Sequence, residues 1–127
     1  MLQNSHAFSG FSVDNLEAAQ KFYSETLGLT IELQPEMGFR LKFPSGHTVF
    51  VYDKPNHVPA EFTILNFPVD DIDAAVQELG SKGVQFEHYE GLQQGEKNIA
   101  RGKAAGMGPD IAWFKDPAGN ILSVLQN

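Results

Sequence analysis

Short apolar runs alternate with polar turns along the whole chain and predict strands in most of it. The expected strands are residues 5–13, 29–33, 39–43, 48–53, 61–69, 84–89, 111–114 and 121–125. Between them, apolar residues recur at helical spacing from residue 16 to 27 and again within 70–82. Asp14 or Asn15 is placed to cap the first helix, and Gly28 and Gly83 to end the two helices. The order β-α-β-β-β therefore occurs twice.

Two stretches of sequence also occur twice in the same order. The nine residues from Phe11 return 56 residues later with five identities, and the stretch from Lys42 returns 73 residues later from Lys115. An internal repeat sets the architecture of a chain. We expect one α+β domain spanning 1–127, built from module one (5–53), a linker (54–60) and module two (61–126). The longer second offset places extra residues in module two, within 90–109.

Composition narrows the function classes. The 127 residues include 16 acidic and 9 basic side chains, and the net charge of −7 disfavours a nucleic-acid partner. Without cysteine there is no thiolate chemistry. No apolar run has the roughly 18 residues of a membrane span, and the start has no signal-peptide pattern. We therefore expect a cytoplasmic protein with no membrane partner.

Three motifs resemble the vicinal oxygen chelate superfamily, the glyoxalase/bleomycin-resistance/dioxygenase group. They begin at Val13 (Val-Asp-Asn-Leu), at Phe22 (Phe-Tyr-Ser-Glu-Thr-Leu-Gly-Leu) and at Phe114 (Phe-Lys-Asp-Pro-Ala-Gly-Asn). The resemblance covers nearly the whole chain. It implies two βαβββ modules that form an incomplete barrel with a cup between them, the same modules that the repeat predicts.

The resemblance also implies four metal-ligand positions on the first and last strand of each module. These positions hold Phe8, Phe50, Ile64 and Ser123. Divalent metals need imidazole, carboxylate or comparable donors, so we expect no metal and no cofactor. A displaced ligand set stays open as an alternative, drawn from His6, His47, His57, Glu61 and His88.

Strand alternation extends the set of side chains expected to face the cup. The expected lining is aromatic and apolar with a few polar groups, which is typical of small-molecule sites. Strand 111–114 is too short to decide which face Trp113 takes, and plain core filling is the alternative for the aromatic residues. The candidate ligand-binding residues are His6, Phe8, Ser12, Phe50, Tyr52, Phe62, Ile64, Asn66, Ser123 and Trp113.

The glycine-rich segment 90–109 is too long to be an ordinary connection. If it closes over the cup, Lys97, Arg101 and Lys103 become anion contacts. A solvated loop is the alternative.

These observations predict a protein that binds a small aromatic or apolar molecule without the family metal, as bleomycin-resistance-type proteins bind drugs without turnover. A lyase, isomerase or dioxygenase with displaced metal ligands is the rival, and turnover stays undecided. A cup packed solid is a third alternative. The resemblance and the exposed strand edges also predict a homodimer.

Overall fold

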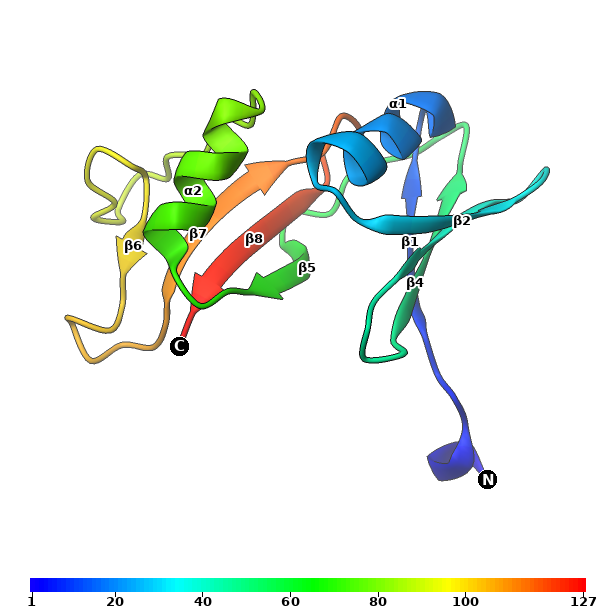
Figure 1. Cartoon of the computed structure of the whole chain (residues 1–127), viewed down its shortest axis with the longest axis horizontal. Coiled ribbons are helices and arrows are strands. Elements are labelled where there is room, and N and C mark those ends of the chain that lie inside the picture. The colour runs from blue at the N-terminus through cyan, green and yellow to red at the C-terminus, as the bar shows by residue number, and fades with distance from the viewer. The chain divides into compact units, whose positions relative to one another are not determined.

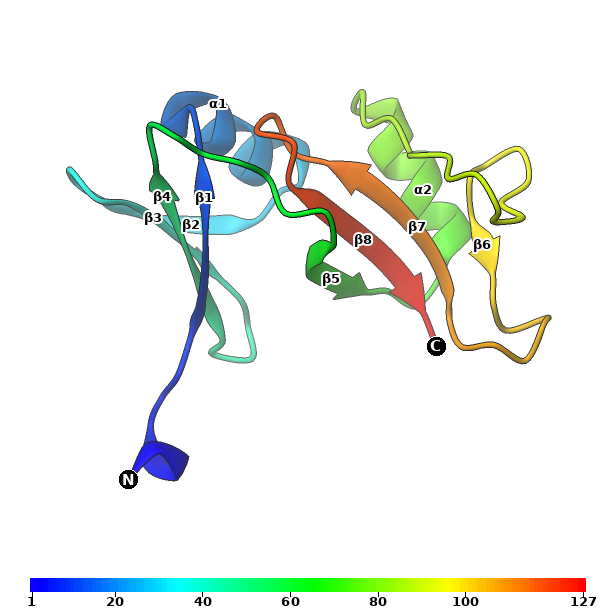
Figure 2. The same cartoon turned by 180° about the vertical axis from the view of Figure 1, so that it is seen from behind.

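The proline-containing stretch at residues 54–60 separates the two halves of the chain in a computed structural model that describes residues 1–127. The chain divides there into two units, Met1–Val58 and Pro59–Asn127. Each unit holds a four-stranded mixed sheet and an α-helix, so the α+β prediction is confirmed. Figures 1 and 2 show α1 against one side of the first sheet and α2 against one side of the second.

The first sheet has the strand order β1-β4-β3-β2, in which β1 runs parallel to β4 and the other pairs are antiparallel. A short 3-10 helix, η1, precedes the sheet, and a π-helical segment, η2, continues α1. The bounds are η1 Leu2–Asn4, β1 Ser9–Val13, α1 Leu16–Lys21, η2 Phe22–Thr26, β2 Thr30–Gln34, β3 Gly38–Lys42 and β4 Thr48–Asp53.

Local signals fix the ends of the first helical segment as the sequence predicts. The Asn15 side chain accepts a hydrogen bond from the Ala18 N–H at 3.0 Å, which makes Asn15 the cap. Gly28 ends the segment with φ +70°, and the following Leu29 N–H donates to the Tyr23 carbonyl at 2.9 Å.

Tyr23 is the centre of the first unit's core. It is fully buried, and its ring lies 5.8 Å from that of Phe11 and 6.2 Å from that of Phe39. Leu41 and Val51 are also fully buried on this face. Burying each such side chain contributes about 1.5–3 kcal/mol. The helical segment therefore packs against one face of the sheet, and the other face carries no helix.

The second sheet repeats this plan with the order β5-β8-β7-β6, again with one parallel pair, β5 with β8. Asp71 caps α2 by accepting from the Ala74 N–H at 3.1 Å. Ile72 and Val76 are the buried residues of this helix. The same strand order in both units agrees with the sequence repeat. The bounds are β5 Thr63–Pro68, α2 Ile72–Ser81, β6 Ala100–Arg101, β7 Asp110–Lys115 and β8 Ile121–Gln126.

The prediction of a strand over residues 84–89 is wrong. Only Phe86 makes a β-bridge there, to Phe114, and the Glu87 N–H donates to the Trp113 carbonyl at 2.8 Å. The fourth strand of the second sheet is β6, which comes from the segment 90–109 and pairs with the start of β7. Two separate segments thus share the edge of β7.

Two predicted strand starts are also too early. Strand β1 begins at Ser9, so His6 and Phe8 precede it, and Phe8 is 60% exposed. Strand β5 begins at Thr63, which leaves Phe62 outside it and 69% exposed. A register shift between Thr63 and Leu65 makes Ile64 the extra residue of a bulge, and the simple alternation through Ile64 fails there.

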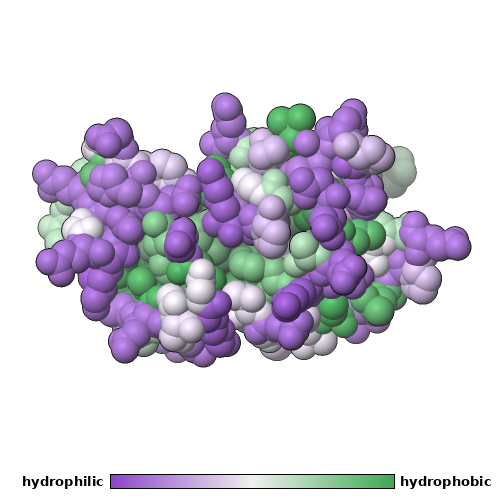
Figure 3. Space-filling view, turned by 90° about the horizontal axis from the view of Figure 1, so that it is seen from above, coloured by the Kyte–Doolittle hydropathy of each residue, from purple (hydrophilic) through white to green (hydrophobic).

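Neither helix has the length or the apolar composition that crossing a membrane requires. In the view of Figure 3, hydrophilic side chains cover much of the surface and hydrophobic ones lie between them.

Candidate functional site

Strand alternation places an aromatic pair on the helix-free face of the first sheet. Val49 and Val51 of β4 are buried on the helix side, so Phe50 and Tyr52 lie on the opposite face. Their rings are stacked, with centroids 5.8 Å apart and planes 18° apart, and both side chains are half-buried. We call Phe50 and Tyr52 the aromatic shelf.

Small residues flank the shelf on the neighbouring strands. Gly10 is the register partner of Phe50 on β1, whereas Tyr52 has Ser12 on β1 and Gly38 on β3. A Cβ on Gly10 would meet the Phe50 carbonyl at 3.1 Å, and one on Gly38 would collide with the Val51 carbonyl. Gly38 also has φ +143°, which side-chain-bearing residues rarely adopt. From three of the four paired positions, therefore, little or no side chain covers the rings.

A serine–histidine pair lies beside Tyr52. The Ser12 hydroxyl and the His57 Nδ1 atom are 2.7 Å apart, and the tautomer of the ring determines which one donates. His57 belongs to the predicted linker, and its side chain is half-buried and held against β1. This pair gives the shelf a polar end.

Arg40 of β3 is the remaining register partner of Phe50. Its side chain is 44% exposed, and its guanidinium makes no hydrogen bond and lies 3.7 Å from the nearest carboxylate oxygen, that of Glu32. Lys42 lies 3.4 Å from the same carboxylate. Two cations thus share one anion on this face. Arg40 is not among the predicted site residues, although the alternation in 39–43 places it opposite the buried Phe39 and Leu41.

The helix-free face of the second sheet has its own polar contacts. The Trp113 indole N–H donates to the Thr63 hydroxyl at 3.0 Å, and the Ser123 hydroxyl donates to the side-chain oxygen Oδ1 of Asn66 at 2.6 Å. Ser123 is fully buried. The structure therefore brings Trp113, Asn66 and Ser123 to one face, with Thr63 rather than Ile64 as their neighbour, and their polar atoms bind one another.

Tyr89 packs edge-on against Trp113, with ring centroids 5.5 Å apart. Its hydroxyl is buried and has no hydrogen-bond partner. Burial raises the pKa of Tyr89 above the usual value of 10.0, and the nearby Glu87 carboxylate adds to the effect. No sequence signal identifies Tyr89, because its position depends on the irregular segment after Phe86.

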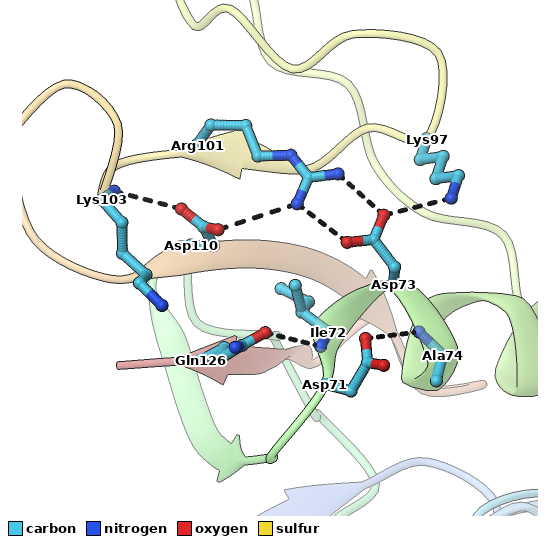
Figure 4. A network of polar contacts seen from close by, with 9 residues as sticks. All are labelled: Asp71, Ile72, Asp73, Ala74, Lys97, Arg101, Lys103, Asp110 and Gln126. Carbon is cyan, nitrogen blue, oxygen red and sulfur yellow. Dashed lines mark hydrogen bonds and ion pairs between the residues drawn. The ribbon is translucent and has the colours of Figure 1, made fainter.

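The loop cations make ion pairs within the second unit (Figure 4). Arg101 binds both carboxylate oxygens of Asp73 on α2 at 2.8 and 3.0 Å, and Lys97 binds the same carboxylate at 3.1 Å. These hydrogen bonds lower the pKa of Asp73 well below its usual range, and those from Arg101 have a larger effect than the one from Lys97. At Lys103 it is the backbone N–H that donates to Asp110, at 3.1 Å. Two of the three expected anion contacts are thus already paired with carboxylates.

An open hollow of about 330 Å³ lies in the same segment. Its walls include the paired Lys97 and Arg101 and a buried Gln94 whose amide is fully engaged with the backbone. The lining is Gln93, Gln94, Gly95, Glu96, Lys97, Ile99 and Arg101.

The residues at the four implied ligand positions do not fit a metal ion. Phe8, Phe50 and Ile64 carry no donor atom, and the Ser123 hydroxyl is buried and bonded to Asn66. Within either unit, no three His, Asp or Glu side chains gather in a way that could hold a metal ion. The chemistry that the helix-free face of the first sheet offers is therefore stacking, hydrogen bonding and charge pairing through Arg40.

The chain belongs to the glyoxalase/bleomycin resistance protein/dioxygenase superfamily, which its sequence matches over residues 5–124. No functionally curated protein matches it significantly. Among solved structures, it is similar to a glyoxalase family protein from Bacillus anthracis, with 21% identity, a TM-score of 0.68 and coverage of 100% of this chain and 99% of the other. A glyoxalase/dioxygenase from Nostoc punctiforme is 16% identical, with a TM-score of 0.65 and coverage of 98% and 91%.

One further similar structure carries a function in its name. TnmS3, an antibiotic binding protein from Streptomyces sp. CB03234, is 25% identical, with a TM-score of 0.65 and coverage of 97% of each chain. The other two similarities concern the fold alone.

Proposed function

We propose that this protein binds a small planar aromatic molecule on the aromatic shelf and does so without a metal ion. The observation that carries the proposal is the stacked, half-buried pair Phe50 and Tyr52, flanked by residues too small to cover it. Aromatic rings attract one another in offset or tilted arrangements, so such a surface suits a flat ligand. The similarity to TnmS3 supports binding as the activity.

The same face offers little for turnover. The implied metal positions hold Phe8, Phe50, Ile64 and Ser123, whose side chains are not suitable ligands for a divalent metal. Binding therefore requires fewer assumptions than a lyase, isomerase or dioxygenase activity does.

The test is a titration of the protein with a panel of fused-ring aromatic fragments, including 2-naphthamide. Ligand-observed NMR monitors the binding of each fragment and gives its Kd. Phe50→Leu keeps an apolar side chain but removes the ring. Because aromatic pairs contribute about 0.5–1.5 kcal/mol beyond their buried area, we expect Kd to rise about two- to twelvefold.

The matched control is Phe43→Leu, since Phe43 is another half-buried phenylalanine, stacked with His47 away from the shelf. This variant is expected to keep the wild-type affinity. A panel without any binder that depends on Phe50 contradicts the proposal. Chemical conversion of a bound fragment, visible in the same spectra, would instead support the enzyme.

A further inference from the structure

We infer that the ligand is an aromatic monoacid, a flat ring system bearing one carboxylate that Arg40 binds. This inference rests on the proposed function, because it assumes that the ring lies on the aromatic shelf. The charge of the ligand, and Arg40 as the residue that recognises this charge, go beyond the proposed function.

The register of the sheet places the cation next to the ring. Arg40 and Phe50 are directly paired residues of antiparallel strands, and both project from the helix-free face. Side chains of directly opposite residues have Cβ atoms about 4.5–5.5 Å apart. A carboxylate attached to a ring stacked on Phe50 is therefore within reach of the guanidinium.

Arg40 has hydrogen-bonding capacity to spare. Its one charged neighbour, the Glu32 carboxylate, lies at 3.7 Å, beyond hydrogen-bonding distance, and is also contacted by Lys42 at 3.4 Å and by the Gln34 amide at 3.0 Å. A guanidinium has five N–H donors in a planar fork that matches a carboxylate. The Arg40 side chain is 44% exposed and so accessible to a ligand.

The local charge fits a single negative group. Arg40 and Lys42 carry two positive charges against the one negative charge of Glu32. The whole chain has a net charge of −7, which opposes anions and a dianion more strongly. A monocarboxylate neutralises the local excess without adding to the repulsion, and this favours it over a phosphate.

The experiment compares 2-naphthoate with 2-naphthamide, which share the ring system and differ in charge. In the wild type we expect the naphthoate to bind about tenfold more tightly, as a charge-assisted hydrogen bond is roughly twice as strong as a neutral one. In Arg40→Gln this advantage should disappear, while the Kd of the naphthamide stays unchanged. Lys42→Gln is the matched control, on the same face of the same strand, and should keep most of the preference.

The outcomes separate the two proposals. If naphthamide binding depends on Phe50 but naphthoate binds no better, the shelf stands and the role of Arg40 is overturned. If Lys42→Gln removes the preference as fully as Arg40→Gln does, the selection is diffuse and not a contact of Arg40. If no compound of the panel, these two included, binds in a way that depends on Phe50, both proposals fail. Melting temperatures of Arg40→Gln and Lys42→Gln equal to that of the wild type confirm that both variants fold.

Discussion

Asp116 shows at the scale of a single residue why the Asp-Pro-Ala-Gly-Asn stretch is a signature of the fold and not of an activity. One of its carboxylate oxygens accepts from the N–H groups of Ala118 and Asn120, both at 2.9 Å. The other accepts from the Asn120 side-chain amide at 3.0 Å. Both side chains are buried, with 5% and 2% exposure. The carboxylate thus holds the turn between β7 and β8.

Replacing Asp116 by alanine should destabilise the protein by about 2–4 kcal/mol. The change removes three acceptor contacts and leaves buried donors unpaired, each costing about 1–3 kcal/mol, in part offset by water. Urea denaturation measures the loss. Asp14→Ala is the control, since Asp14 is exposed and precedes the cap of α1, and it should stay within about 0.5 kcal/mol of the wild type. Equal stabilities of the two variants would show that the carboxylate does not hold the turn.

Residues of the candidate site differ in how far the sequence could identify them. Phe50 and Tyr52 follow from alternation, because a strand sends every second side chain to the same face. The contact between Ser12 and His57 joins residues 45 positions apart and depends on how the linker folds back, which no local pattern encodes. The hydrogen-bonding state of Arg40 depends in the same way on its neighbours across the sheet.

At the scale of elements, local signals predict where a segment begins and ends, and tertiary pairing decides the rest. The strand Thr48–Asp53 is where its own sequence places it, and Asn15 is one of the two residues predicted to cap the first helix. Residues 84–89 have a strand-like composition, but the segment that follows takes over part of the edge of β7. A two-residue strand such as β6 has no periodicity of its own, so only its pairing defines it.

Gln94 stabilises the segment that replaces the missing strand. Its side chain is 3% exposed, accepts from the Tyr89 N–H at 2.7 Å, and donates to the carbonyls of Glu87 and Asn98, both at 2.9 Å. It therefore satisfies three backbone groups that a regular strand would have paired. The ends of the loop are joined by side chains and not by a ladder, since the Asn98 amide also donates to the Phe86 carbonyl at 3.2 Å.

Gln94→Ala should loosen this loop without unfolding the sheet. Losing contacts to three backbone groups costs at least about 1 kcal/mol, so amide hydrogens near Asn98 should exchange about fivefold faster or more. Hydrogen-exchange mass spectrometry on peptides covering 88–102 measures this. Gln93→Ala provides the control, because Gln93 is the exposed neighbour of the same residue type. Equal exchange in the two variants would mean that other contacts hold the loop.

At the scale of the whole molecule, the two units share a strand order but not the chemistry of their helix-free faces. The aromatic shelf of the first unit has Phe50 where the repeat places Ser123 in the second. Ser123 binds Asn66, and Trp113 binds Thr63, so the polar groups of the second face are paired among themselves. Duplication preserved the architecture, and the side chains then diverged, which is why the repeat predicts the fold better than it predicts the site.

That divergence extends to the positions where the family resemblance implies metal ligands, and it leads to a prediction for the intact chain. Elemental analysis of protein purified without chelator or affinity tag should find far less than one metal ion per chain. Added Ni²⁺, Zn²⁺, Mn²⁺ or Fe²⁺ should leave the melting temperature unchanged. If the chain had a specific site, metal at a concentration about 100 times its Kd would stabilise the fold by about 2.7 kcal/mol. This is enough to raise the melting temperature by several degrees. Near-stoichiometric metal with such a rise would mean that displaced donors replace the missing ligands. His6→Ala and His57→Ala would then show whether either histidine supplies them, and a metal-dependent enzyme would become the better account of the protein.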